Sequence, residues 1–247
     1  MNIQEISANL KPLEERIQQA CRRAGRERHE VQLIAVSKTF PVEAVVAAVH
    51  AGLTIFAENR VQEADQKFSA LASSLAMEDQ GGAAGAAERG FKLHLIGHLQ
   101  SNKARRAAEI FDMIQTVDRI EVALKLSRSC EQLNRLLPVL IQVNLGNEET
   151  KSGVEPSGAL ELVRKVSELK ALRVRGLMAI PPFRDHAEES RADFRAIRRL
   201  AEEIAKPRLA NVSMHELSMG MSHDFEVAIE EGATMIRLGT AIFGKRS

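Results

Sequence analysis

The sequence predicts a single (β/α)8 barrel over residues 1–247, with one extra helix before the first strand. Short apolar, β-branched runs alternate with helically periodic segments, and this unit occurs eight times. Eight βα units in about 250 residues are typical of a closed parallel barrel. A doubly wound open sheet is the alternative, but no G-x-G-x-x-G follows the first apolar run, as a dinucleotide-binding sheet would require.

The elements follow in order along the chain. A charged, helically periodic opening helix ends near Gly25, and residues 31–36 (VQLIAV) have the composition of a buried strand. Pro41 and Gly52 mark the beginning and the end of the next helix. The eight predicted strands are residues 31–36, 54–59, 92–97, 113–117, 138–144, 174–180, 212–220 and 234–239. The predicted helices after the first seven strands are residues 41–51, 61–75, 102–111, 119–133, 156–169, 188–205 and 224–231.

Composition excludes several classes of protein. With 34 Lys and Arg against 33 Asp and Glu, the chain has no overall field to attract nucleic acid or a membrane surface. Cys21 and Cys130 are far apart and form no C-x-x-C pair, so we expect reduced thiols. The first residues lack the apolar stretch of a signal peptide, and we expect a cytoplasmic protein. Residues 77–90 are rich in Gly and Ala and predict a mobile loop, to which we assign no function.

Functional groups of such barrels lie at the carboxyl ends of the strands, and phosphate is often bound after strands seven and eight. Here residues 218–222 (SMGMS) form a small-residue turn before a helix, whose free N–H groups suit an anion. Residues 237–244 (RLGTAIFG) follow strand eight, where Gly239 lets a phosphate approach the backbone. Either loop alone is ordinary turn chemistry, but together they lie at the expected phosphate corner.

Lys38 comes directly after the first strand, so its amine should lie over the barrel mouth. A solvated loop lysine is the plain interpretation. The alternative is a lysine that forms a Schiff base, because a partly desolvated amine beside other cations loses its proton readily and attacks aldehydes. A phosphate corner opposite this lysine makes a phosphorylated aldehyde the natural ligand.

Seven motifs carry a family resemblance that runs in order from about residue 3 to 244: AVSKTFP, FAENRVQE, HLIGHLQSNK, QVNLGNEETKSG, RGLMAIPP, HELSMGMSHDFEVAIEEG and MIRLGTAIFG. They resemble the pyridoxal phosphate homeostasis proteins, which share the barrel fold of the alanine racemase N-terminal domain. The resemblance implies that pyridoxal 5'-phosphate (PLP) is the cofactor and that Lys38 carries it as a Schiff base. The sequence departs from the family in two places: Ala57 stands where the family commonly has Gly, and the segment 77–90 is longer than is typical.

The resemblance also assigns the remaining contacts. Arg237 would face the pyridine nitrogen, and Asn59 and Met178 would lie beside the ring. The phosphate contacts would be Ser218 and Met219 after strand seven, and Gly239 and Thr240 after strand eight. Ala57 narrows the space near Asn59, so the contact between Asn59 and the ring is the assignment that this departure affects most.

Three functions remain open from the sequence. The first is a PLP carrier or buffer that supplies apo-enzymes, and the second is an amino-acid racemase-like enzyme. PLP enzymes use a protonated pyridine nitrogen as an electron sink, and a permanently cationic Arg237 opposes that protonation. Alanine racemases also have such an arginine, but they use a tyrosine from a further domain as second base, and this chain contains no tyrosine. The third is an unrelated barrel lyase or aldolase that uses Lys38 with a sugar phosphate.

Other signals are set aside. His94, His98, His215 and His223 flank strand ends, but without clustered carboxylates or cysteines they predict packing or surface roles and no metal site. The racemase-type dimer depends on a domain that this chain lacks, so we expect a monomer. We expect PLP and apo-enzymes that depend on it as partners, with neither nucleic acid nor membrane.

Overall fold

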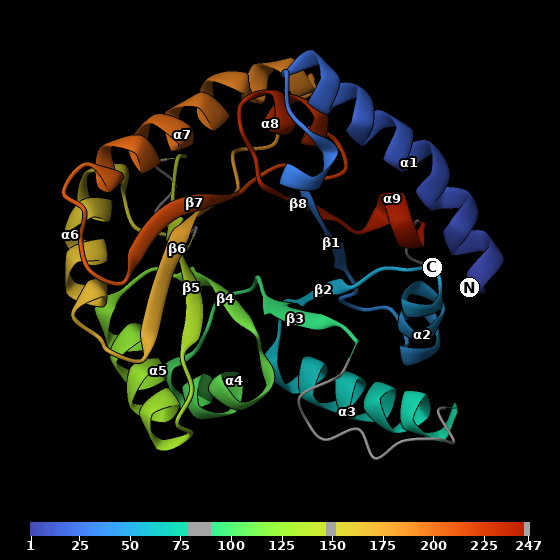
Figure 1. Cartoon of the computed structure of the whole chain (residues 1–247), viewed down its shortest axis with the longest axis horizontal. Coiled ribbons are helices and arrows are strands. Elements are labelled where there is room, and N and C mark those ends of the chain that lie inside the picture. The colour runs from blue at the N-terminus through green and yellow to red at the C-terminus, as the bar shows by residue number, and fades with distance from the viewer. Residues whose placement is uncertain (79–89, 147–151, 245–247) are drawn as a thin grey trace.

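The centre of the molecule is a closed parallel barrel (Figure 1). The computed structural model describes residues 1–78, 90–146 and 152–244. The strands follow one another around the barrel in chain order, and β1 closes it by pairing with β8, with Ile34 opposite Arg237. The predicted (β/α)8 barrel is therefore confirmed, including the extra N-terminal helix α1.

The strands are β1 Gln32–Val36, β2 Ile55–Glu58, β3 Lys92–Leu95, β4 Met113–Val117, β5 Leu137–Val143, β6 Leu172–Ala179, β7 Val212–Ser218 and β8 Met235–Leu238. The α-helices are α1 Ile3–Arg23, α2 Val42–His50, α3 Val61–Glu78, α4 Ala104–Ile110, α5 Ile120–Gln132, α6 Pro156–Ser167, α7 Arg191–Ala205, α8 Phe225–Glu230 and α9 Thr240–Phe243. Short 3-10 helices cover Arg28–Glu30, Ser101–Lys103 and Ala187–Ser190.

The predicted strands and helices differ from the observed ones by a few residues at their ends, and one short helix was not predicted. Helix α3 continues to Glu78, so the first two residues of the predicted loop are helical, and residues 79–89 lie outside the described part of the chain. The sequence did not predict α9, because four residues are too short for a periodic pattern. Its Phe243 is buried and stacks on Phe40, with ring centroids 4.9 Å apart, so α9 is fixed by packing rather than by propensity.

Helix α1 is amphipathic and lies along the outside of the barrel beside α8 and α9 (Figure 1). Asn2 caps its first turn through a capping box with Glu5, which satisfies two backbone N–H groups. Ile6 and Ile17 are fully buried on the face that packs against the barrel's helices. Burial of this apolar stripe is what holds the extra helix in place.

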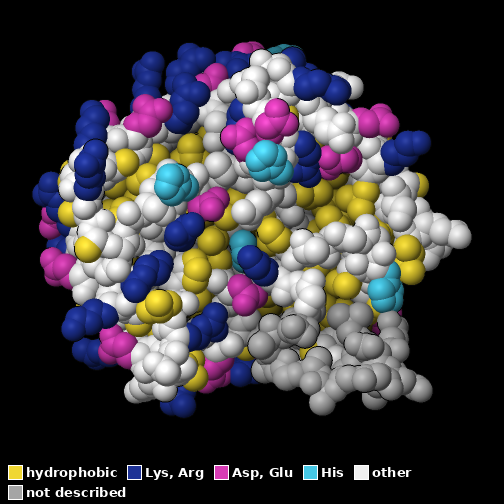
Figure 2. All heavy atoms as spheres, in the orientation of Figure 1, with side chains coloured by type: hydrophobic (Ala, Val, Ile, Leu, Met, Phe, Trp, Pro, Cys, Tyr) yellow, Lys and Arg dark blue, Asp and Glu magenta, His cyan; other side chains and the backbone are white. Residues whose placement is uncertain are grey.

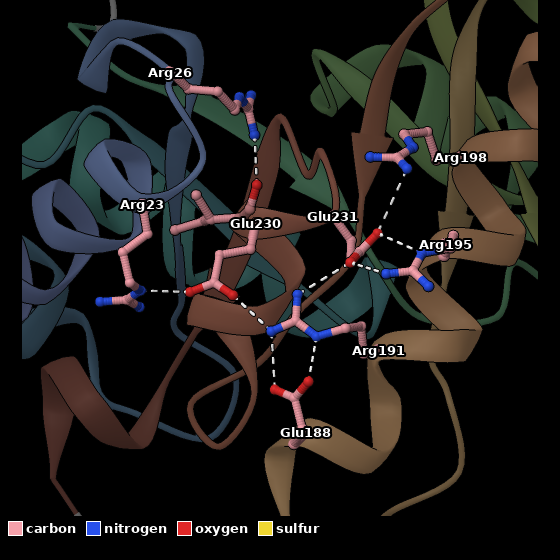
Figure 3. A network of polar contacts seen from close by, with 9 residues as sticks. Arg23, Arg26, Glu188, Arg191, Arg195, Arg198, Glu230 and Glu231 are labelled. Carbon is pink, nitrogen blue, oxygen red and sulfur yellow. Dashed lines mark hydrogen bonds and ion pairs between the residues drawn. The ribbon is translucent and has the colours of Figure 1, made fainter.

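Figure 3 shows an ion-pair network that joins α1, α7 and α8. Glu231, at the end of α8, is almost fully buried and accepts hydrogen bonds from Arg191 and Arg195 of α7 at 3.0 and 2.9 Å. Glu230 accepts from Arg191 at 2.6 Å and from Arg23 of α1 at 2.6 Å. The two neighbouring carboxylates thus tie helices from both ends of the chain to the same corner of the barrel.

The barrel interior is built in two layers. A buried apolar cluster is formed by side chains from six strands: Ile34, Ala57, Met113, Leu140, Met178 and Met235. Side chains two residues further along a strand point the same way, so Gln115 and Arg237 lie above Met113 and Met235. The apolar layer closes the barrel, and the polar layer above it forms the floor of the mouth.

The outer surface is mixed in charge. On the face shown in Figure 2, basic and acidic side chains are intermixed around the rim, and no large patch of one sign covers it. None of the described helices is both long and apolar enough to cross a membrane.

Candidate functional site at the barrel mouth

The eight residues assigned from the sequence lie on one continuous arc of the barrel. They come from the ends of β6, β7, β8, β1 and β2, which are consecutive neighbours in the closed strand order. Met178 pairs with Ser218 across β6 and β7, and Arg237 pairs with Ile34 across β8 and β1. Closure of the barrel therefore brings together residues from both ends of the chain.

Arg237 is the fixed cation of this arc. It is 4% exposed, and it donates hydrogen bonds to Oγ of Ser218 at 2.7 Å and to the carbonyl oxygen of Ala179 at 2.9 Å. Burial lowers its pKa to about 10, partly opposed by the charge of Asp224, so the guanidinium remains charged at neutral pH. Both hydrogen-bond partners are neutral oxygens, and these two bonds use two of the five N–H donors of the guanidinium, which can only donate to a ligand.

A buried relay of hydrogen bonds holds Arg237 from below. The hydroxyl of Ser218 donates to Oε1 of Gln115 at 2.6 Å, and the amide nitrogen of Gln115 lies 3.0 Å from Nδ1 of His94. Burial lowers the pKa of His94 to about 4, so its ring is neutral and Nδ1 accepts from the amide. Each hydrogen bond of the relay then has one defined donor and one defined acceptor, and together these bonds fix the orientation of the guanidinium.

An unpaired stretch of backbone lies between the ends of β7 and β8. The ladder between these strands continues as far as Arg237, whose N–H donates to the carbonyl of Gly220 at 3.0 Å. In the described part of the chain, no hydrogen bond is made by the backbone N–H groups of Gly239, Thr240 or Ser222. The side chains of Thr240 and Ser222 meet there at 3.2 Å. We call these groups the anion corner: the backbone N–H groups of Gly239, Thr240 and Ser222 and the hydroxyls of Thr240 and Ser222. They can donate hydrogen bonds to an anion.

Two of the residues assigned to phosphate are already engaged elsewhere. Ser218 is fully buried and its hydroxyl takes part in the relay, while the N–H of Met219 donates to the carbonyl of Met235 at 3.1 Å. Gly239 and Thr240 are the assigned residues whose donors face the corner. The sequence assignment missed Ser222, although it lies in the same SMGMS turn.

Lys38 is half-buried and lies in the turn that directly follows β1, next to β8. A Cβ atom on Gly239 would meet the carbonyl oxygen of Val36 at 3.3 Å, which shows how closely the chain around Gly239 approaches the end of β1. The amine-bearing turn and the anion corner are thus adjacent parts of the mouth.

Asn59 and Met178 occupy different depths. Met178 is fully buried in the apolar layer of the barrel. Asn59 lines a hollow of about 320 Å³ at the mouth, together with His98 after β3, Gln142 of β5 and Ile180 after β6. This hollow lies among the ends of β2, β3, β5 and β6, whereas the anion corner lies between the ends of β7 and β8.

Sequence reasoning missed the residues that support the site from inside. Gln115 could have been found, because its amide is a strongly polar group within the short strand MIQTV, all of whose residues are buried. His94 was set aside as a packing residue, and it is indeed buried inside the barrel beside Gln115. Among the described residues, no three His, Cys, Asp or Glu side chains are grouped so as to hold a metal ion.

Comparisons with known proteins identify the family of the chain. The model of the alanine racemase N-terminal domain matches residues 8–247. A pyridoxal phosphate homeostasis protein of Aquifex aeolicus is 43% identical over 232 residues, which is 94% of each chain. The protein of the same name from Haemophilus influenzae is 42% identical over 247 residues, covering 100% of this chain and 97% of that one. The chain belongs to the pyridoxal phosphate homeostasis protein family.

Several solved structures are similar to this family member. PipY of Synechococcus elongatus, solved with PLP bound, matches with a TM-score of 0.78 and 37% identity over 97% of this chain and 100% of that one. A protein of Bifidobacterium adolescentis described as unknown matches with a TM-score of 0.88 and 36% identity, covering 98% and 95%. An alanine racemase of Clostridium difficile has a TM-score of 0.70 at 13% identity, which shows a shared fold alone, and this family member covers 58% of its chain.

Proposed function

We propose that the chain binds PLP across the barrel mouth through a Schiff base on Lys38 and carries or buffers this cofactor for the PLP-dependent enzymes of the cell. The observation that carries the proposal is the arrangement of Arg237, Lys38 and the unpaired corner at Gly239. A buried cation with neutral partners, an amine and a set of anion donors lie on adjacent strands. The membership of the family and the PLP-bound PipY structure support the choice of ligand.

The residues present fit the cofactor in charge and in chemistry. PLP supplies an aldehyde and a phosphate when it is bound. Lys38 would hold PLP covalently through its side-chain nitrogen, with the release of one water. Gly239 and Thr240 would hold the phosphate, assisted by Ser222, while Arg237 would donate to the pyridine nitrogen. Asn59 and Met178 would bound the ring, and Ser218 and Met219 would contribute to the wall behind the phosphate.

Two features favour a carrier over an enzyme. Arg237 stays charged at neutral pH and can only donate, so it would keep the pyridine nitrogen unprotonated and weaken the cofactor as an electron sink. The chain also has no tyrosine to serve as second base in a racemase-type reaction. A residual racemase-like activity is the alternative, and the shared fold with alanine racemase is its support.

Borohydride reduction followed by peptide mass mapping tests the proposal. We expect a pyridoxyl group on Lys38, a yellow wild type and a colourless Lys38→Ala variant. Lys103→Ala is the matched control, because Lys103 lies beside the same mouth, on a hollow next to Asn59, and should leave the colour unchanged. Absence of an adduct on Lys38 would reject the carrier and the racemase together. Racemisation of L-amino acids at enzyme-like rates would favour the racemase.

The proposal also covers transfer and location. We propose that the protein is a cytoplasmic monomer that hands PLP to apo-enzymes. Mixing the PLP-loaded protein with an apo-aminotransferase and following recovery of its activity tests the transfer, with free PLP at the same concentration as reference. Light scattering at several protein concentrations tests the monomeric state.

A further inference from the structure

The turn that carries Lys38 has a strained backbone. The N–H of Phe40 donates to the carbonyl of Ser37 at 3.1 Å, so Lys38 and Thr39 are the two central residues of a tight turn. Thr39 has a φ of 68°, in the left-handed region that β-branched residues rarely adopt. Such a conformation persists only where surrounding contacts hold it, and it is typical of functional sites.

Three charged side chains, those of Glu58, Glu63 and Lys67, form hydrogen bonds with this turn. Glu63 of α3 accepts a hydrogen bond from the N–H of Thr39 at 2.6 Å. Glu58, the last residue of β2, is fully buried and accepts from the hydroxyl of Ser37 at 2.8 Å. Both residues that flank Lys38 are therefore bound directly to a carboxylate.

Lys67 connects the two carboxylates to the turn. Its ammonium group donates to Glu58 at 2.7 Å, to Glu63 at 3.1 Å and to the carbonyl of Ser37 at 2.8 Å. These contacts use all three donors of the ammonium group. The Lys67 side chain is 8% exposed, so the contacts are poorly screened by solvent.

We propose that Glu58, Glu63 and Lys67 form a clamp that holds the strained turn so that Lys38 presents its amine to the cofactor, which makes them positioning residues. This inference rests on the proposed function, because it assumes that Lys38 binds PLP. It explains why the FAENRVQE motif, whose Glu58 and Glu63 contact no part of the anion corner, belongs to the site: its carboxylates fix the neighbouring turn rather than the ligand.

Glu63→Ala tests the clamp. Removal of this acceptor frees the N–H of Thr39 and leaves the strain uncompensated, so we expect faster hydrogen exchange at Thr39 in the protein without PLP. We also expect PLP affinity to fall about tenfold, the effect of losing one hydrogen bond to a charged group. Thr39→Gly in the same background should restore most of the affinity, because glycine adopts positive φ without strain. Lys67→Met is less suitable, since it leaves the buried carboxylate of Glu58 without its cation.

Glu109→Ala is the matched control. The Glu109 side chain is 27% exposed against 30% for Glu63, and each forms an i,i+4 ion pair on its helix. Both variants should unfold at similar urea concentrations, and Glu109→Ala should bind PLP like the wild type with the same visible band. The clamp is refuted if Glu63→Ala binds PLP as tightly as Glu109→Ala with an unchanged band. A wild type that yields no adduct on Lys38 refutes the proposed function itself, and the clamp with it.

Discussion

The hydroxyl of Ser218 gives the sharpest test of how the site is built. In the structure it links Arg237 to Gln115 inside the barrel, at 2.7 and 2.6 Å. Ser218→Ala would leave one guanidinium N–H and one amide oxygen without partners. An unsatisfied buried polar group costs about 1–3 kcal/mol, so we expect a loss of roughly 3 kcal/mol in the free energy of unfolding. For a chain of this size that corresponds to a decrease in Tm of roughly 6–12 °C.

Urea denaturation without PLP measures this loss directly. Far-ultraviolet circular dichroism is the suitable probe, because the chain has no tryptophan or tyrosine for fluorescence. Ser129→Ala is the matched control: Ser129 is also buried, but its hydroxyl donates only to the carbonyl of Lys125 one helical turn earlier, at 2.9 Å. We expect that control to lose less than about 1 kcal/mol.

The alternative role of Ser218 predicts a different result. If its hydroxyl serves the phosphate and not Arg237, Ser218→Ala unfolds like Ser129→Ala and loses only PLP affinity. That outcome would contradict the relay. A double-mutant cycle with Gln115→Leu adds a second criterion, because residues of one hydrogen-bond network show coupling of about 0.5–3 kcal/mol, whereas independent sites are additive.

Further predictions concern stability and close approach. Glu231→Ala should cost about 2 kcal/mol at neutral pH, measured by urea denaturation, because it removes the acceptor of Arg195 and one of the acceptors of Arg191. Burial alone would raise the pKa of Glu231, but the arginine hydrogen bonds outweigh it and lower that pKa, so this stabilisation is present above the ordinary pKa of 4.5 and is lost as pH falls through the lower folded value. Gly97→Ala should give an insoluble or strongly destabilised protein, since its Cβ would lie 2.1 Å from the carbonyl oxygen of Asn59. Gly239→Ala should fold, because its Cβ meets its nearest backbone oxygen at 3.3 Å, but titration should show several-fold weaker PLP binding.

The sequence by itself determined the architecture and the position of Lys38. Strand and helix patterns are local, so eight alternating units could be counted without knowledge of any contact, and the count specified a closed barrel. The position after the first strand placed Lys38 at the mouth for the same reason. The motifs also identified the family, which the comparisons confirmed.

Only the tertiary structure decided which side chains support one another. Ser218 and Gln115 are 103 residues apart, and no local pattern indicates that the hydroxyl of the first donates a hydrogen bond to the amide oxygen of the second. In the same way, the strain at Thr39 and its relief by Glu63 depend on how α3 packs beside the end of β1. Pairwise contacts inside a barrel are set by closure and register, which bring together residues whose sequence separation carries no signal.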